Sequence, residues 1–185
     1  MRVVDEQGSD LPPGTEGRFL VRTPAMFVGY LGHEDWYAQA FTGDRWFDTG
    51  DLATLDPDGY MRITGRTKDI INRGGEKVPA AELEECLYAH PAVAEVAVVG
   101  MPDPRLGERA CAYVVLRPGS ELTLSDVQHH LSEMRMAKQY WPERLEVIAE
   151  MPRTPSGKIQ KYLLRRWIAE RLMATGAVET GGAGG

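Results

Sequence analysis

The spacing of hydrophobic and polar residues changes near residue 66, and this change divides the chain into two parts. In the first part, short apolar runs predict strands at 18–22, 52–55 and 60–64. Asp56-Pro57-Asp58-Gly59 separates the last two runs and carries proline and glycine where a tight turn needs them. We therefore expect a β-rich segment over residues 1–66, with an aromatic and irregular stretch from Trp36 to Trp46.

The second part alternates helix-like and strand-like patterns. Apolar runs predict strands at 93–99, 110–116 and 145–148, and helical spacing predicts helices at 79–89, 125–136 and 159–173. The continuous apolar run at 93–99 is typical of a strand covered on both faces. Ser125 is the expected N-cap of the middle helix. The last helix is expected to bury Trp167 and to expose a solvated basic face made of Lys161, Arg165, Arg166 and Arg171.

This alternation predicts the α+β fold class, with a compact domain over residues 71–173. The segment 1–66 has too few apolar residues for a convincing core of its own, so we interpret it as the trailing edge of a larger domain. Glycine and alanine dominate residues 174–185, which predicts a disordered tail.

Charge and composition exclude several classes of protein. The formal net charge of -6 argues against general nucleic-acid binding, which needs a basic surface. No run approaches the roughly 18 apolar residues of a transmembrane helix, and the first residues are too polar for a signal peptide.

Cys86 and Cys111 have no partners at metal-ligand spacing, and the adjacent His129 and His130 point apart on a helix. We expect buried reduced thiols, no metal site and a cytoplasmic location.

Lys158 is the first candidate for chemistry. It lies in a glycine-hinged turn, Pro152 to Lys161, directly before the last predicted helix. A lysine ammonium delivered by such a turn suits a phosphate or a developing negative charge. Taken alone, the same lysine also fits a solvated surface position.

Three further stretches have side chains suited to a nucleotide. Asp51 ends a Thr-Gly-Asp turn and can accept ribose hydroxyls, and Arg66 can bind phosphate or ribose oxygens. Gly74 and Gly75 allow a ligand to approach the backbone closely, although the spacing is not that of a Walker phosphate loop. Taken singly, these stretches also fit a turn-capping aspartate, a surface charge cluster and a flexible turn.

In their order along the chain, these stretches resemble the adenylate-forming (AMP-binding) superfamily. This family includes acyl- and aryl-CoA synthetases, adenylation domains of nonribosomal peptide synthetases and beetle luciferases. The resemblance runs from about Val3 to Arg166, and the matching stretches are 29–32, 46–52, 58–60, 65–84 and 152–158. It implies that 1–66 ends a large N-terminal AMP-binding domain, that 67–70 is a hinge, and that 71–173 is the small C-terminal lid domain.

The resemblance also implies roles for single residues. Lys158 resembles the catalytic lysine that bridges the acyl carboxylate and the α-phosphate during adenylation, and Lys68 falls at the hinge. The residues that resemble cofactor-binding positions are Asp51 for ribose, Arg66 for ribose and phosphate, Gly74 and Gly75 for the pantetheine tunnel, and Lys77 near the phosphates. The implied cofactors are ATP, Mg²⁺ bound mainly by the large domain, and CoA.

The implied reaction is ATP-dependent acyl-CoA synthesis through an acyl-AMP intermediate. The sequence of residues 66–77 is most similar to that of CoA ligases of fatty, alicyclic and aromatic acids. The Gly/Ala-rich end of the chain favours free CoA over a tethered thiol as the acceptor. The family's phosphate loop, adenine motif and acyl pocket are not seen before Gly29, so we expect a C-terminal part that is inactive alone. A separate subunit supplying Lys158 in trans to an N-terminal half, and a non-catalytic remnant, are the alternatives.

Overall fold

The computed structural model describes residues 1–180, with side chains to residue 174. The chain separates into two units, Met1–Lys68 and the part from Asp69 onward. Each unit has its own β-sheet and its own buried cluster. No helix within residues 1–180 is both long enough and apolar enough to cross a membrane.

The first unit is a four-stranded antiparallel sheet in chain order. Its strands are β1 (Arg2–Val4), β2 (Gly17–Val21), β3 (Phe47–Leu55) and β4 (Met61–Arg66). Asp56 closes the β3–β4 hairpin, because its Oδ1 accepts hydrogen bonds from the backbone amides of Asp58 and Tyr60. The predicted strands and turn are therefore confirmed, except that β3 begins at Phe47 and not at Leu52, so Asp51 lies within the strand and not in a turn before it. Strand β1 was not predicted because three residues give too short a pattern.

The irregular aromatic stretch contains one short helix, α1 (Glu34–Gln39). Its Tyr37 packs edge-on against Phe27 and Phe41, with ring centroids 5.2 and 4.8 Å apart. The buried cluster of this unit is small, namely Val3, Phe19 and Ala53, and Val4, Leu20 and Leu52 are buried outside it. This small core agrees with the scarcity of apolar residues in the sequence.

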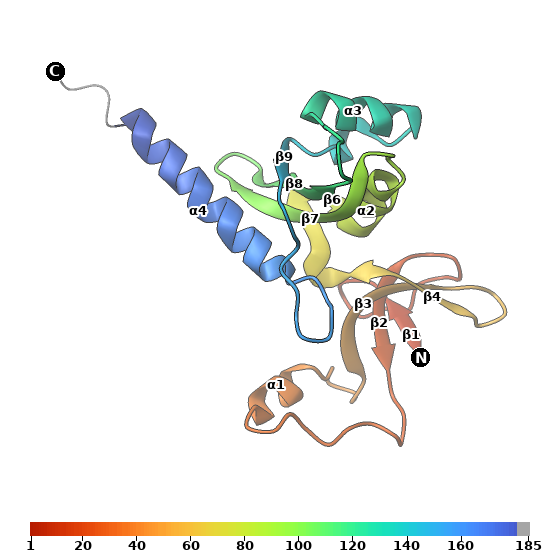
Figure 1. Ribbon diagram of the computed structural model, residues 1–185. Coiled ribbons are helices and arrows are strands. Elements are labelled where there is room, and N and C mark those ends of the chain that lie inside the picture. The colour runs from red at the N-terminus through yellow and green to blue at the C-terminus, as the bar shows by residue number, and fades with distance from the viewer. Residues whose placement is uncertain (181–185) are drawn as a thin grey trace. The chain divides into compact units, whose positions relative to one another are not determined.

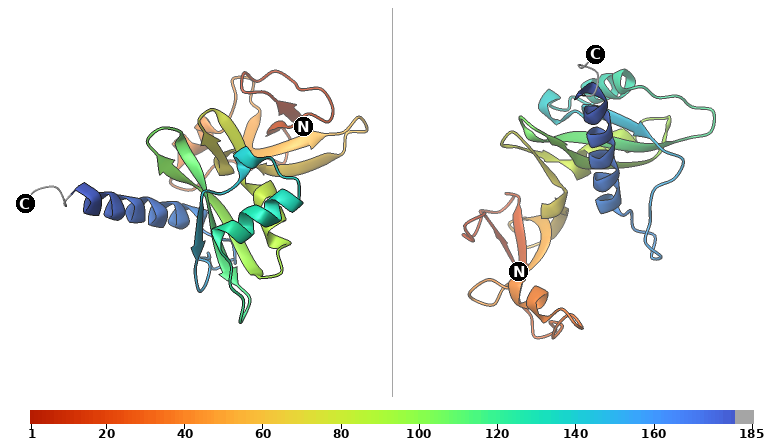
Figure 2. Two further views of the ribbon diagram at one scale, coloured as in Figure 1. Left: turned by 90° about the horizontal axis from the view of Figure 1, so that it is seen from above. Right: turned by 90° about the vertical axis from the view of Figure 1, so that its left-hand side faces the viewer.

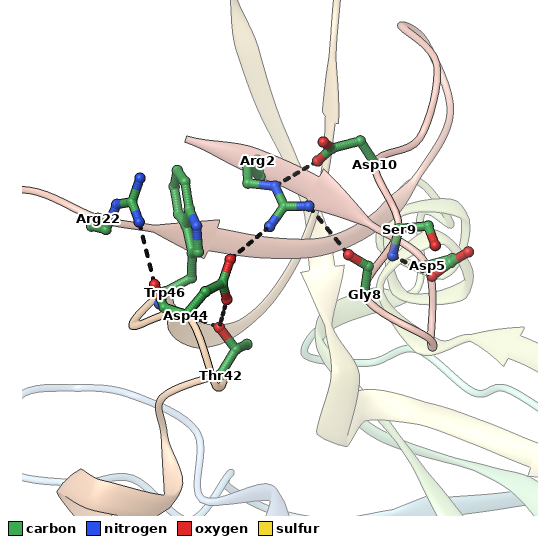
Figure 3. Close-up of polar contacts among 9 residues, drawn as sticks. All are labelled: Arg2, Asp5, Gly8, Ser9, Asp10, Arg22, Thr42, Asp44 and Trp46. Atoms are coloured by element: carbon green, nitrogen blue, oxygen red, sulfur yellow. Dashed lines mark hydrogen bonds and ion pairs between the residues drawn. The ribbon is translucent and has the colours of Figure 1, made fainter.

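Arg2 ties β1 to the turns beside it (Figure 3). Its Nε lies 2.6 Å from Asp10 Oδ1 and its Nη2 donates to the Gly8 carbonyl at 3.2 Å. The Arg2 guanidinium also lies 5.4 Å from the centroid of Trp46. Polar and cation–π contacts thus supplement the small apolar core in holding the N-terminal strand.

The second unit is a five-stranded mixed sheet with three helices. Its strands are β5 (Ile70–Arg73), β6 (Glu76–Pro79), β7 (Val93–Asp103), β8 (Gly107–Leu116) and β9 (Arg144–Val147). The order is β6-β5-β8-β7, and β9 pairs with β8 as the parallel member. The helices are α2 (Ala80–Tyr88), α3 (Leu124–Glu133) and α4 (Lys161–Thr180), with a 3₁₀ turn η2 (Lys138–Tyr140). A further 3₁₀ turn, η1 (Thr67–Asp69), includes the last two residues of the first unit and the first residue of the second.

Helices cover both faces of β7 and β8 (Figures 1 and 2). Val98 and Ala112 face α2 and α3, while the neighbouring Val99 and Cys111 face α4. Side chains alternate between faces along a strand, so both sets of a continuous apolar run are buried here. The predicted doubly covered strand is confirmed.

The boundaries of α3 and α4 differ from the sequence prediction. Thr123, not Ser125, is the N-cap of α3, because Thr123 and Asp126 form a reciprocal capping box. Helix α4 continues to Thr180, so the expected disordered tail from residue 174 begins inside a helix, and residues 181–185 lie outside the described part. The two changes show that capping contacts and helix ends are weakly encoded in the local pattern.

The basic face expected on α4 is engaged in ion pairs rather than only solvated. Arg165 donates to Asp69 Oδ1 at 2.8 Å, and Lys161 lies 2.8 Å from Glu84 Oε1. Arg171 pairs with the buried Glu146. Trp167, expected to be buried, keeps 38% of its surface exposed.

Candidate functional site

Lys158 lies on the loop that joins β9 to α4 and extends away from the sheet (Figures 1 and 2). Arg153 and Ile159 form an isolated antiparallel bridge, which makes the loop a narrow hairpin. Gly157, at the tip, has a φ of +85°, a backbone conformation that residues with a side chain rarely adopt. The fold therefore presents Lys158 as an exposed residue beside a tight turn.

Thr154 holds the backbone of Lys158 from two directions. The Thr154 amide donates to the Lys158 carbonyl at 2.9 Å, and the Lys158 amide donates to Thr154 Oγ1 at 3.1 Å. The hydroxyls of Thr154 and Ser156 lie 2.9 Å apart. The polar residues of this motif thus shape the loop and leave the lysine side chain outside it.

Gly74 and Gly75 form the two-residue turn of the β5–β6 hairpin, which the sequence analysis did not predict. Their φ values are +61° and +96°, as a type I′ turn requires. The Gly74 amide donates to the Leu106 carbonyl at 2.7 Å, and a Cβ on Gly74 would lie 2.9 Å from Leu106 Cδ2. Turn geometry therefore explains both glycines without any ligand, and the close approach of Leu106 is a second reason at Gly74.

The Lys158 loop and the Gly74–Gly75 turn lie at opposite ends of β7. Arg153 of the loop binds Glu95 near the start of β7, whereas Leu106 follows the end of β7 at Asp103. A strand rises about 3.3 Å per residue, so Glu95 and Asp103 are about 25 Å apart. The second unit therefore carries two candidate functional loops, one at each end of β7.

Asp51 and Arg66 come together in the first unit. They face each other across β3 and β4, and Arg66 Nε lies 3.2 Å from Asp51 Oδ1. Gly50 precedes Asp51 with a φ of +73°, and the Asp51 amide is bonded to Thr49 Oγ1. Strand pairing thus joins two residues that the sequence analysis had proposed separately.

Lys68 and Lys77 occupy different structural settings. Lys68 is in η1, at the last position of the first unit, and Asp69 begins the second unit. Lys77 is on β6, opposite Asn72 of β5. The boundary between the two units therefore falls within residues 67–70, the segment predicted to be the hinge.

Cysteine and histidine residues lack the setting of a catalytic or metal site. Burial raises the pKa of the Cys111 thiol to about 12, and burial also raises the pKa of Cys86. His130 Nε2 lies 2.9 Å from the Cys86 carbonyl oxygen, while His129 is near Glu133. Among the described residues, no group of three or more His, Cys, Asp or Glu is arranged to hold a metal ion.

Sequence reasoning missed the ion pairs that fasten the Lys158 loop. Arg153 lies within the predicted turn and Glu95 within the predicted strand at 93–99, and neither was given a role. The signal in the sequence is weak, because the two residues are 58 positions apart and each is an ordinary charged residue. Their contact depends on how the loop folds back onto β7.

Comparisons with known proteins identify relatives over both units. Residues 82–158 match the family described as the AMP-binding enzyme C-terminal domain. The medium-chain fatty-acid–CoA ligase of Escherichia coli (strain K12) is 47% identical over 173 residues, which are 93% of this chain and 31% of that ligase. The 2,3-dihydroxybenzoate-AMP ligase of Bacillus subtilis (strain 168) is 42% identical over 174 residues, 94% of this chain and 32% of the relative.

A solved structure agrees with the sequence matches. ATP-bound MatB from Rhodopseudomonas palustris matches with a TM-score of 0.82 at 37% identity, over 89% of this chain and 33% of MatB. The chain spans about a third of the length of the curated relatives it matches. The resemblance noted in the sequence is confirmed: the chain belongs to the adenylate-forming (AMP-binding) superfamily and corresponds to the C-terminal portion of its acyl-CoA ligases and adenylating enzymes.

Proposed function

We propose that this chain is the C-terminal part of an ATP-dependent acyl- or aryl-CoA ligase and that Lys158 is its catalytic residue for adenylation. The observation that carries the proposal is the separation of the Lys158 loop from the Gly74–Gly75 turn at opposite ends of β7. A two-step ligase needs different groups at the reacting atoms in each step. A domain with a loop at each end can supply them in turn.

In the first step, a carboxylate oxygen attacks the α-phosphate of ATP, and pyrophosphate leaves as acyl-AMP forms. Two anionic groups must approach each other, so a cation between them stabilises the transition state. The exposed Lys158 side chain provides such a cation on a loop whose backbone is held by Thr154. ATP is accompanied by Mg²⁺, which we assign mainly to the part of the enzyme outside this chain.

In the second step, the CoA thiol attacks the acyl carbon and AMP leaves. We assign residues 67–70 as the hinge, with Lys68 at its centre, between the end of the large domain (1–66) and the lid domain (71–173). Rotation there would withdraw Lys158 and bring in the Gly74–Gly75 turn, where the absence of side chains leaves room for the pantetheine arm. The change of structural unit at Lys68 supports this assignment.

The first unit would bind the nucleotide. Asp51 has its Oδ1 paired with Arg66, and we assign its Oδ2 to a ribose hydroxyl of AMP. Arg66 remains largely exposed and can reach a ribose or phosphate oxygen as well. In the second unit, we assign Lys77 to the phosphates because its side chain is basic and it lies beside the glycine turn.

The substrate we propose is a fatty or aromatic carboxylic acid, with free CoA as the acceptor and the cytoplasm as the location. Relatives named for medium-chain fatty acids and for 2,3-dihydroxybenzoate support this range. The acyl pocket belongs to the part of the enzyme outside this chain. The chain alone should therefore form no acyl-AMP.

ATP–pyrophosphate exchange tests the proposal with medium-chain fatty acids and hydroxybenzoates as substrates. Three samples would be compared: the chain alone, the chain mixed with the N-terminal part of the Escherichia coli relative, and a fusion of the two. We expect exchange in the fusion and none in the chain alone. Exchange in the mixture would identify a subunit that acts in trans, and exchange by the chain alone would contradict the proposed division of the active site.

Lys158→Ala should lower exchange in the active sample by about 100-fold or more, as expected for loss of a group that stabilises transition-state charge. Lys138→Ala removes another exposed lysine of the same unit and should leave exchange unchanged. Full activity of Lys158→Ala would contradict the assigned role.

A further inference from the structure

The Lys158 loop is fastened at its two ends in different ways. After the loop, Lys161 in the first turn of α4 pairs with Glu84 of α2 at 2.8 Å. Before the loop, Met151 is buried in the core against α4. Between these anchors the tip, Pro155 to Lys158, is exposed. The direction in which the tip points therefore depends on contacts that the loop residues themselves make.

Arg153 makes the contact that joins the loop tip to the sheet. Its Nη1 donates to the Gly157 carbonyl at 2.6 Å, and its Nη2 donates to Glu95 Oε2 at 2.5 Å. Gly157 is the residue directly before Lys158. One planar guanidinium thus connects β7 to the peptide that precedes the lysine, and we call Arg153, Glu95 and Gly157 the Arg153 clasp.

The chemistry of the side chains suits a positioning role. A guanidinium has fixed donor directions, so two bonds from one group set the position of Gly157 relative to Glu95. A lysine or a neutral side chain at position 153 could not hold both acceptors in the same way. A fixed Gly157 carbonyl in turn restricts where the Lys158 backbone begins.

The clasp is poorly placed to stabilise the fold. The side chains of Arg153 and Glu95 are 42% and 38% exposed, and exposed ion pairs contribute little to folding stability. The buried residues beneath the loop, such as Leu164 and Ile168, pack without them. The clasp holds the peptide directly before the candidate catalytic lysine. Its effect on the position of Lys158 is therefore larger than its effect on folding stability.

We propose that Arg153, anchored by Glu95, is a positioning residue that sets the place of Lys158 for adenylation and has no part in thioester formation. This inference rests on the proposed function, because it assumes that Lys158 acts in the first step only. A misplacement of about 1 Å in a catalytic group can cost about 100-fold in rate. The Arg153 clasp would prevent that loss.

The test measures the two half-reactions separately in the sample that supports exchange. Adenylation is followed by ATP–pyrophosphate exchange, and thioester formation by release of AMP from chemically prepared acyl-AMP and CoA. Arg153→Ala should lower exchange by about tenfold or more and leave thioester formation unchanged. Arg153→Lys should lose part of the exchange, and Glu95→Gln should lower exchange in the parent but not in Arg153→Ala, because the pair acts as one unit.

Arg166→Ala is the matched control, since this arginine lies on α4, the helix that follows the loop, and pairs with Glu170. It should leave both half-reactions unchanged. The urea midpoint of every variant should match that of the parent, which would show that each variant is folded.

Three results would overturn the proposal. Full exchange by Arg153→Ala, while Lys158→Ala is inactive, would remove the positioning role and leave the proposed function intact. An equal fall in both half-reactions, with a lower urea midpoint, would show a purely structural role. Full exchange by Lys158→Ala would overturn the proposed function together with this inference.

Discussion

Gly74 and Gly75 show how backbone conformation decides the identity of single residues. Both have positive φ, and Gly74 also approaches the Leu106 side chain closely. The sequence analysis predicted a role for these glycines in ligand approach, which stays a proposal. The structure supplies a second reason for them, because a type I′ turn favours glycine at both positions.

Gly75→Ala should therefore lower the free energy of unfolding by about 1–2 kcal/mol, through backbone strain alone. No described atom lies within 4 Å of the added Cβ, so steric clash is not involved. Gly75→Asn should lose less, because asparagine tolerates positive φ better than alanine. Urea unfolding of the three proteins measures the difference, and equal stability of Gly75→Ala and the parent would contradict the assigned strain.

Asp51 and Arg66 make a related point about residues far apart in the chain. Each could be predicted as a candidate from its local motif, Thr-Gly-Asp or Gly-Arg. Their pairing at 3.2 Å could not be, because it depends on the β3–β4 register, which has a shift between Leu52 and Ala53. Local sequence identified the two groups, and strand pairing brought them together.

Helix α3 shows the same limit at the scale of an element. Its existence was predicted from apolar spacing, since Val127 and Leu131 are buried on one face. Its start was wrong by two positions, because both Thr123 and Ser125 can cap a helix. The structure selects Thr123, whose side chain and amide both bond to Asp126.

Thr123→Ala should lower the free energy of unfolding by about 1 kcal/mol, the usual cost of removing an N-cap side chain. Ser125→Ala is the control, and it should change stability by much less because Ser125 lies within the helix. Urea unfolding followed by far-UV circular dichroism compares the two. A larger effect of Ser125→Ala would restore the original boundary.

The β5–β6 hairpin is the element that sequence reasoning lost altogether. Each strand has four residues, and the paired positions include polar side chains such as Asn72 and Lys77. Short polar strands give little periodicity. Of the residues in these two strands, only Ile71 and Val78 are fully buried. They belong to the core cluster that also contains residues of α2 and β8, so their burial depends on tertiary packing.

At the scale of the molecule, the two units differ greatly in their cores. The second unit has buried clusters on both faces of its sheet, whereas the first has one cluster of three residues. Burial of apolar surface is the main source of folding stability. The second unit therefore has the core of an independently folding domain.

A protein made of residues 69–185 should fold on its own and unfold cooperatively, while residues 1–68 alone should not. Near-UV circular dichroism and urea unfolding of the two pieces measure this difference. Trp141 and Trp167 report on the second unit, and Trp36 and Trp46 report on the first. A cooperative transition in the isolated first unit would show that its polar contacts, such as those of Arg2, suffice for folding.

The sequence by itself determined the α+β class, the doubly covered strand at 93–99, the exposed turn of Lys158 and the superfamily. These features depend on local periodicity, turn chemistry and motif order, which a chain carries without folding. The tertiary structure decided the Asp51–Arg66 pair, the β5–β6 hairpin, the Thr123 cap and the Arg153 clasp. Each of these is a contact between residues whose partners are selected by strand register or by packing, and neither register nor packing exists until the chain folds.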